Sequence, residues 1–284
     1  MNTNPWKYVE IDESELMTNP YLHPPTLPTP SPRPASDPIP AVHFVGDSIV
    51  LEDIACFDAD GNIFENYQKL AVQKDIFRNP QGRQIILTPY LGAVHCEKNG
   101  LFLPSFALSC AIVARLYQTA VRKEPTGYTT LDAEVEKVLY QYKDKGNGTG
   151  WHTQNTVINW GAQQIIHYPQ DGDFPVHGGN NNINQSQLQK KLAFDRTGFS
   201  DNTLVDALQK PNFNKYLRNL TGLKSPSILV DISAYFGKTA RVWISSSNDT
   251  RAAWFGCYSN NLNLNGNSNL DNNSAGRGVR RGAP

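Results

Sequence analysis

The feature that most constrains the fold is an Asn-rich stretch at the end of the chain that also holds large apolar residues. The stretch SNNLNLNGNSNLDNNSAGRGVRRG runs from Ser259 to Gly282. Asn and Gly tracts are typical of loops or low-complexity disorder, and NNNINQSQLQ at 180–189 is a second such tract. Trp254, Tyr258 and Leu262 lie inside or beside the C-terminal stretch, however, and such side chains require burial or a partner. We therefore expect strands in AAWFGCYS, in part of the Asn tract and in GRGVRRG.

Composition bounds the class of protein. A chain of 284 residues with 39% hydrophobic and 10% aromatic residues can bury a sizeable core. Its formal net charge is zero, which argues against nucleic-acid binding, because that binding depends on a basic surface. No apolar run approaches the roughly 18 residues of a membrane span. The acidic start MNTNPWKYVEIDESEL is not a recognisable signal peptide. We expect a soluble chain without a nucleic-acid partner or a membrane span, and its localisation stays open.

Prolines between residues 20 and 40 divide the chain into an N-terminal segment, 1–42, and a domain, 43–284. The segment PYLHPPTLPTPSPRPASDPIP has too many prolines for a helix or a central strand. It indicates a strap or linker, with an SH3-type ligand as the alternative.

An α+β fold with two early helices, a small antiparallel β-sheet and long irregular loops is expected for the domain. Ser105 and Thr130 are candidate N-caps of the two helices. Asp60-Gly61-Asn62 predicts a hairpin turn. GRQIILTPYLGAVH is expected to hold a strand, and 151–200 to hold loops with a few short strands. We predict a short helix in TLVDALQKPNFNKYLRNLTG and two strands in SPSILVDISAYFGKTARVWISSS.

Motifs for catalysis and metal binding are weak. FVGDSIV resembles the opening block of the GDSL esterases, but the last histidine is His177 and no DxxH follows, so Asp47 and Ser48 are better explained as a turn cap. DADGNIFE begins like a calcium loop, yet Ile63 stands where that loop needs Gly. Histidines form no HExxH motif and no close pair, and neither a Walker loop nor GxGxxG is present. No metal and no cofactor are expected.

Four cysteines, Cys56, Cys96, Cys110 and Cys257, are widely spaced and form no CxxC pair. A cysteine zinc site is therefore unsupported. Buried free thiols are favoured, and a single long-range disulfide stays open.

The end of the chain supports one family resemblance. From Arg241 to Gly282 the order is W-x-S-S, A-W-F, an Asn-rich stretch and a closing G-x-V-R-R. This order resembles the end of C-type lectin fold proteins of the formylglycine-generating-enzyme type. It resembles more closely the variable proteins of diversity-generating retroelements, whose terminal stretch is hypervariable. GLFLPSFALSCAIVARL at 100–116 is similar to the turn and first helix of those folds. The resemblance covers 87–116 and 241–282.

The resemblance implies a diversified binding surface in the variable region, 241–282. Retroelement copying substitutes adenines, so an AAC codon for Asn can come to encode many other residues but never a stop. The scaffold residues that would brace the surface are Trp243, Trp254, Val279 and Arg280. The candidate variable residues are Ser247, Asn248, Asp249, Phe255, Cys257, Tyr258, Ser259, Asn260, Asn261, Asn263, Asn265, Asn267, Asn269, Asp271, Asn272 and Asn273.

The function implied is non-enzymatic ligand binding. Formylglycine-type oxidation uses a pair of late cysteines, and only Cys257 lies in the variable region. Calcium-dependent sugar binding needs clustered carboxylates, whereas Asp249 and Asp271 are isolated. The expected partner is a protein or glycan on another cell or on a host. The chain would then be surface-displayed or virion-associated. The alternatives are an undiversified lectin-like or phage-fibre-type adhesion module and, with less support, a GDSL-like esterase.

Overall fold

Two β-sheets and six helices make up the part of the chain that the computed structural model describes, which is residues 42–121, 130–143, 151–168, 189–272 and 274–282. The chain divides into the units Met1–Pro38 and Ile39–Pro284, and all described residues belong to the second. The Pro-rich strap or linker that we expected lies outside the described residues.

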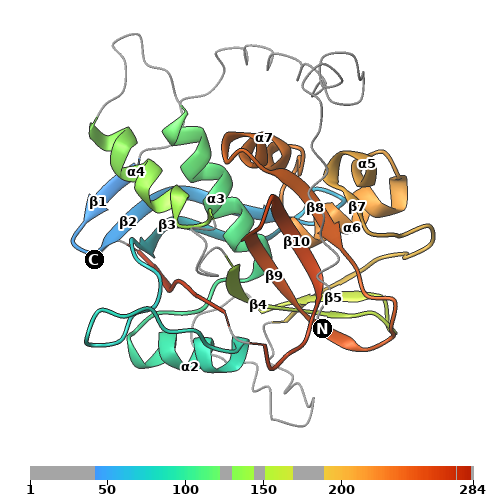
Figure 1. Ribbon diagram of the computed structural model, residues 1–284, viewed down its shortest axis with the longest axis horizontal. Coiled ribbons are helices and arrows are strands. Elements are labelled where there is room, and N and C mark those ends of the chain that lie inside the picture. Colours follow the sequence, from blue (N-terminus) through green and yellow to red (C-terminus); the bar gives the residue numbers. More distant parts are fainter. Residues whose placement is uncertain (1–41, 122–129, 144–150, 169–188, 273, 283–284) are drawn as a thin grey trace, which may run out of the picture. The chain divides into compact units, whose positions relative to one another are not determined.

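The first sheet is antiparallel throughout and has the strand order β1-β2-β3-β11 (Figure 1). The expected hairpin joins β2 to β3, and the Asp58 carboxylate accepts the backbone N–H groups of Asp60 and Asn62 in its turn. The last strand comes from the C-terminal end of the chain, as GRGVRRG predicts. The four strands are β1 Val42–Val45, β2 Ser48–Phe57, β3 Ile63–Gln73 and β11 Val279–Arg281.

The second sheet has seven strands in the order β6-β5-β4-β9-β10-β8-β7. It is larger than the small antiparallel sheet that we expected, and it is mixed, because β10 pairs with β8 in parallel and with β9 in antiparallel orientation. Its strands are β4 Trp151–Asn159, β5 Gln164–His167, β6 Lys190–Ala193, β7 Asn202–Thr203, β8 Thr239–Trp243, β9 Thr250–Tyr258 and β10 Asn261–Ser268.

The prediction of two early helices is wrong in number. Both predicted helices, α3 Phe106–Ala120 and α4 Thr130–Tyr140, are present, and the expected short helix is a pair, α5 Leu204–Leu208 and α6 Pro211–Thr221. Two further helices occupy segments that we expected to be strands. They are α2 Pro89–Lys98, which Thr88 caps, and α7 Ile228–Tyr235.

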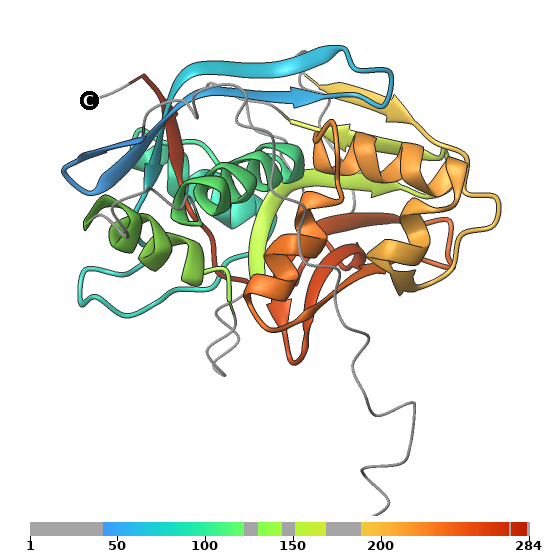
Figure 2. The same cartoon turned by 90° about the horizontal axis from the view of Figure 1, so that it is seen from above.

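The helix α3 contacts both sheets, through β2 on one side and through β4 and β9 on the other (Figure 2). It begins where predicted, because the Ser105 hydroxyl accepts the backbone N–H of Leu108. Apolar side chains such as Phe106 and Leu116 are fully buried, as expected for a helix that is covered on most sides.

All four cysteines are buried and free, so the preferred prediction of free thiols is confirmed. Burial raises the pKa of Cys56, Cys96 and Cys110, which keeps these thiols protonated and unreactive.

Candidate functional site

The strand β10 separates polar from apolar side chains by alternation. Leu262 and Leu264 are fully buried in the main core, and Asn261, Asn263 and Asn265 point to the opposite side, because successive side chains of a strand alternate between its faces. The pairing register brings residues of β8 and β9 beside these asparagines. We call this set the Asn face; it comprises Thr239, Arg241, Trp243, Trp254, Tyr258, Asn261, Asn263 and Asn265.

The centre of the Asn face is held by internal hydrogen bonds. The indole Nε1 of Trp243 donates to Asn263 Oδ1, and Asn263 Nδ2 donates to the carbonyl oxygen of Asn261 at 3.3 Å. The guanidinium of Arg241 lies 5.3 Å from the Trp243 ring centroid. Asn263 is only 2% exposed, so its amide supports the face from within.

One end of the Asn face is the turn between β9 and β10. Tyr258 is 58% exposed there, which is unusual for a large aromatic side chain. Ser259 follows with φ 51°, the left-handed region that Asn and Gly adopt more readily than Ser. Lys238 Nζ donates to the carbonyl oxygen of Ser259 and ties the turn to the start of β8.

At the other end, two arginines hold the loop between β8 and β9. Arg196 donates to Asn248 Oδ1 at 3.0 Å. Arg251 donates to Asp249 Oδ2 at 3.0 Å and to Asn269, which follows the end of β10. The loop backbone is also fixed, because Gly161 N donates to the Asn248 carbonyl oxygen at 3.0 Å. The 247–249 loop and the end of β10 therefore form one connected polar rim.

The candidate variable residues fall into three groups by burial. Asn273 lies outside the described residues. Ser247, Asn261 and Asn265 are half-buried, and Asn263 is buried. The exposed residues are Asn248, Asp249, Tyr258, Ser259, Asn260, Asn267, Asn269, Asp271 and Asn272.

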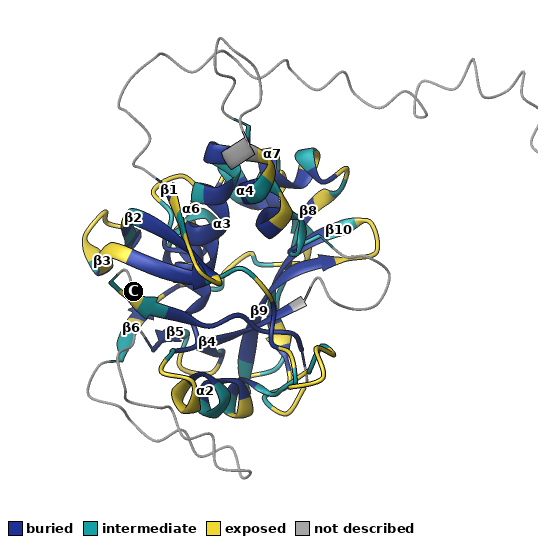
Figure 3. Cartoon of the chain, turned by 90° about the vertical axis from the view of Figure 1, so that its left-hand side faces the viewer, coloured by how far each residue is buried: buried dark blue, intermediate teal, exposed yellow. Residues whose placement is uncertain are grey.

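Three candidates are buried, and two of these, both on β9, belong to the core and not to the surface. Phe255 and Cys257 are both fully buried and belong to the main core. Most of the strand β9 is buried, as the dark blue of this strand in Figure 3 shows. Phe255 packs edge-on against Phe106 of α3, with ring centroids 5.9 Å apart. The alternation of β9 causes this, since Trp254 and Tyr258 occupy the other face. We remove Phe255 and Cys257 from the binding surface.

The scaffold candidates differ in burial. Trp254 is 7% exposed and Val279 is fully buried, whereas Trp243 and Arg280 are half-buried. Val279 pairs with Val72 of β3 and forms a bridge with Phe102. It therefore fastens the C-terminal end of the segment 241–282 to the first sheet.

Arg277, which the sequence indicates only as a structural partner or a rim charge, is a further scaffold residue beside the four candidates. This arginine is 2% exposed and donates to the Lys74 carbonyl oxygen at 2.7 Å, to Gln141 Oε1 at 2.6 Å and to the Gln73 carbonyl oxygen. Its guanidinium lies 5.4 Å from the ring centroid of Tyr142. The flanking Gly276 and Gly278 are the sequence signal, because a Cβ at either position would overlap neighbouring side chains.

The rejected catalytic and metal motifs have structural roles. Ser48 is 3% exposed within β2, and its hydroxyl donates to Asp47 Oδ1 at 3.0 Å. The Asp58 carboxylate is engaged by the hairpin turn. Among the described residues, no group of three or more His, Cys, Asp or Glu side chains could hold a metal ion.

The most strongly perturbed acid, Glu65, is also inside the core. Burial raises its pKa to about 7, and the hydroxyls of Tyr67 and Ser105 donate to its two oxygens at 2.8 Å and 2.9 Å. Because the carboxyl is 6% exposed and joins β3 to the start of α3, it stabilises the packing of these elements.

Comparisons with known proteins add nothing to the resemblance that the C-terminal segment shows, so that resemblance depends on the sequence of this chain alone. No protein-family model, no curated protein and no solved structure matches it. In the described part of the chain, no helix is long and apolar enough to cross a membrane.

Proposed function

We propose that the chain is a non-enzymatic ligand-binding protein with a C-type-lectin-like fold, and that it binds through a retroelement-diversified surface at its C-terminal region. The ligand would be a protein or a glycan on another cell or a host. This surface comprises the accessible part of the Asn face and the polar rim at the 247–249 loop.

The observation that carries the proposal is the alternation of β10. Every second residue from Asn261 to Asn265 is an asparagine on one face, and the residues between them are leucines in the core. A change at Asn261 or Asn265 therefore leaves the core side chains in place. Two exposed candidates, Tyr258 and Asn267, lie near the ends of β9 and β10, and the remaining exposed candidates lie in the segments that flank these strands.

The side chains suit adaptable recognition. Tyr provides a large contact area at low entropic cost, and Asn and Ser can donate or accept hydrogen bonds. Arg196 and Arg251 hold the rim at one end, and Lys238 holds the turn at the other. A surface ordered before binding loses less conformational entropy when the ligand arrives.

The deciding experiment is to sequence the 3′ end of the gene and its flanks in many individuals. Diversification requires a nearby near-copy of the segment encoding 241–282 that differs at its adenines, with a reverse transcriptase gene beside it. Differences should fall at codons for exposed residues and spare those for Leu262, Leu264 and Phe255. A unique and invariant segment would leave the alternative, an undiversified lectin-like adhesion module.

The surface itself is tested by stability measurements. The combined change Tyr258→Ala, Asn260→Ala and Asn267→Ala should alter the free energy of unfolding by no more than ~1 kcal/mol, because all three side chains are exposed. As the matched comparison, Asn263→Ala should cost ~1–3 kcal/mol, since it removes a buried amide and leaves Nε1 of the half-buried Trp243 without its acceptor. Urea unfolding measures both. A large loss in the triple variant would refute the surface claim.

A further inference from the structure

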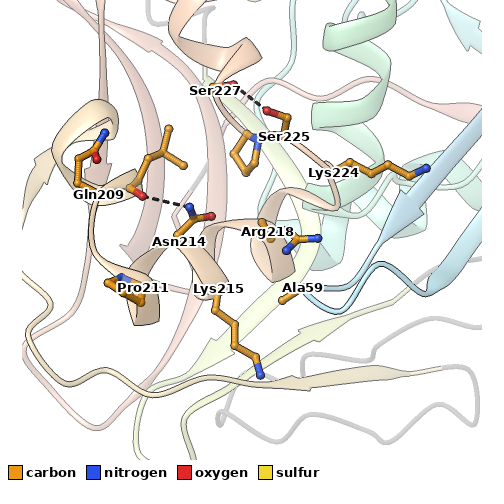
Figure 4. Close-up of a pocket in the computed structure, with 11 residues that line it drawn as sticks. Ala59, Gln209, Pro211, Asn214, Lys215, Arg218, Lys224, Ser225 and Ser227 are labelled. Carbon is orange, nitrogen blue, oxygen red and sulfur yellow. Dashed lines mark hydrogen bonds between the residues drawn. The ribbon is translucent and has the colours of Figure 1, made fainter.

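A cleft outside the Asn face is built by one side of α6 and the turn that follows it. Pro211, Asn214, Lys215 and Arg218 recur at helical spacing, so they share one face of α6, while Phe213, Tyr216 and Leu217 face the core. The cleft has a volume of about 560 Å³, and all four residues of that exposed face line it (Figure 4).

The chain crosses back over this face because α6 ends at Gly222. That glycine has φ 64°, and its N–H donates to the Arg218 carbonyl oxygen. A Cβ at Gly222 would lie 2.7 Å from the Ala107 Cβ, so the turn requires glycine for space as well. The turn brings Lys224, Ser225 and Ser227 to the cleft.

The lining of the cleft is positively charged. Lys215, Arg218 and Lys224 line it, and no acidic side chain does. Lys215 lies 3.9 Å from Asp60, but this pair is exposed and its attraction is screened by water. Lys224 Nζ stands 4.4 Å from the Phe57 ring centroid.

Arg218 is the unusual member of the set. Its side chain is half-buried, and no ion pair or side-chain hydrogen bond joins it to another described residue. Arg277, by contrast, donates to three acceptors. A half-buried guanidinium without an anion is costly, and its planar fork matches phosphate and carboxylate oxygens.

We infer that this cleft is an anion site that takes a phosphate or sulfate group, either as the free ion or as an ester. The guanidinium of Arg218 binds the oxyanion, and Lys215 and Lys224 add positive charge on either side of it (Figure 4). The hydroxyls of Ser225 and Ser227, which lie 2.7 Å apart, supply further donors from the next element. Three cationic side chains around one cleft attract a doubly charged oxyanion more strongly than a singly charged carboxylate.

The inference is independent of the proposed diversification, because no candidate variable residue lines the cleft. The experiment is a titration of the ¹⁵N-labelled full chain with sodium phosphate, sodium sulfate, sodium acetate and glycerol 3-phosphate at matched ionic strength. The Nε–H resonance of Arg218 is followed by NMR.

We expect saturable shifts with phosphate and sulfate at dissociation constants of ~1–10 mM, and at least ~10-fold weaker binding of acetate. Tighter binding of glycerol 3-phosphate than of phosphate identifies an ester as the occupant, and equal binding identifies the free ion. Arg218→Gln should weaken binding ~10-fold or more, and Lys224→Gln, at an exposed position, ~3-fold. Lys98→Gln on α2 is the matched control and should change nothing.

The inference is overturned if phosphate and sulfate shift the Arg218 signal no more than chloride does. It is also overturned if acetate binds as well as phosphate, or if the folded Arg218→Gln and Lys224→Gln variants both bind like the Lys98→Gln control.

Discussion

At the scale of single residues, three buried ionisable groups give the fold a pH dependence. Burial lowers the pKa of His152 to about 3, with the nearby Arg277 charge adding to the effect, and lowers that of His167 to about 4. Both histidines therefore contribute stability above their ordinary pKa of 6.5, and this contribution is lost as the pH falls towards their folded values. Glu65 acts in the opposite direction. Its folded pKa of about 7 exceeds the ordinary 4.5, so its contribution is fully present below 4.5 and is lost as the pH rises through 7.

Replacing Glu65 should therefore steepen acid destabilisation. Between pH 4.5 and 6.5 the folded wild-type chain keeps a proton on Glu65 that the unfolded chain releases, which offsets one of the two histidines. We expect Glu65→Gln to increase the pH slope of the unfolding free energy by about one proton, or ~1.4 kcal/mol per pH unit.

Urea unfolding at several pH values in this window measures the slope, with Glu97→Gln, at an exposed position on α2, as the control. Equal slopes for wild type and Glu65→Gln would mean that the buried carboxyl is ionised in the folded protein throughout the window.

At the scale of elements, the strand β10 is placed in the sheet by the alternation of leucine and asparagine along it, because the leucines require burial. Leu262 and Leu264 are fully buried in the main core, whereas Asn261 is half-buried. The strand lies between β9 and β8, so both of its backbone edges are paired. A polar residue on the core face would therefore be buried without water.

Substitutions on the two faces of β10 should change the free energy of unfolding by very different amounts. Leu264→Asn should lower the free energy of unfolding by ~3 kcal/mol or more, because it removes apolar contacts and buries an amide. Asn261→Leu, on the other face of the same strand, should change it by ~0.5 kcal/mol or less. Thermal and urea unfolding of the pair provide the comparison. Similar losses in both variants would show that the side of β10 opposite the core is also tightly packed.

At the scale of the whole domain, the C-terminal region joins the two sheets. It supplies β8, β9 and β10 to the seven-stranded sheet and β11 to the four-stranded sheet. Between these strands, Arg277 binds the end of β3 and Gln141 just after α4. The C-terminal region is thus fastened at its end to elements that precede it by more than a hundred residues.

Loss of Arg277 should loosen this junction. Arg277→Gln leaves buried carbonyl oxygens without donors, so we expect a loss of ~3 kcal/mol or more in unfolding free energy. Amide hydrogen exchange should become faster at both β11 and the end of β3. Arg83→Gln, at an exposed position, is the control. Unchanged exchange at β3 in a folded Arg277→Gln variant would contradict the role of a junction.

Local signals in the sequence were sufficient to predict several elements of the fold. Ser105 starts α3 because its hydroxyl caps the helix, and Asp60-Gly61-Asn62 turns the β2–β3 hairpin because Gly61 adopts φ 89°. The apolar residues within the Asn tract correctly predicted strands there, since neither disorder nor a solvated loop could bury them. Each of these outcomes depends on residues that are close together in the chain.

Other features were decided only by tertiary packing. The run ILVDISAY suits a strand by composition, yet it forms α7, since Leu229 and Ile232 reach the core at helical spacing. The polar segment 152–156 is a buried part of β4, and residues distant in the chain bond some of its side chains. The Thr156 hydroxyl accepts the N–H of Phe106, and Gln154 Oε1 accepts the Ser109 hydroxyl. The sequence alone determined that the C-terminal tract would form strands, and the side chains of a strand alternate between its two faces. Only the assembled sheets decided which face each residue took, because that depends on the register with strands far away in the chain.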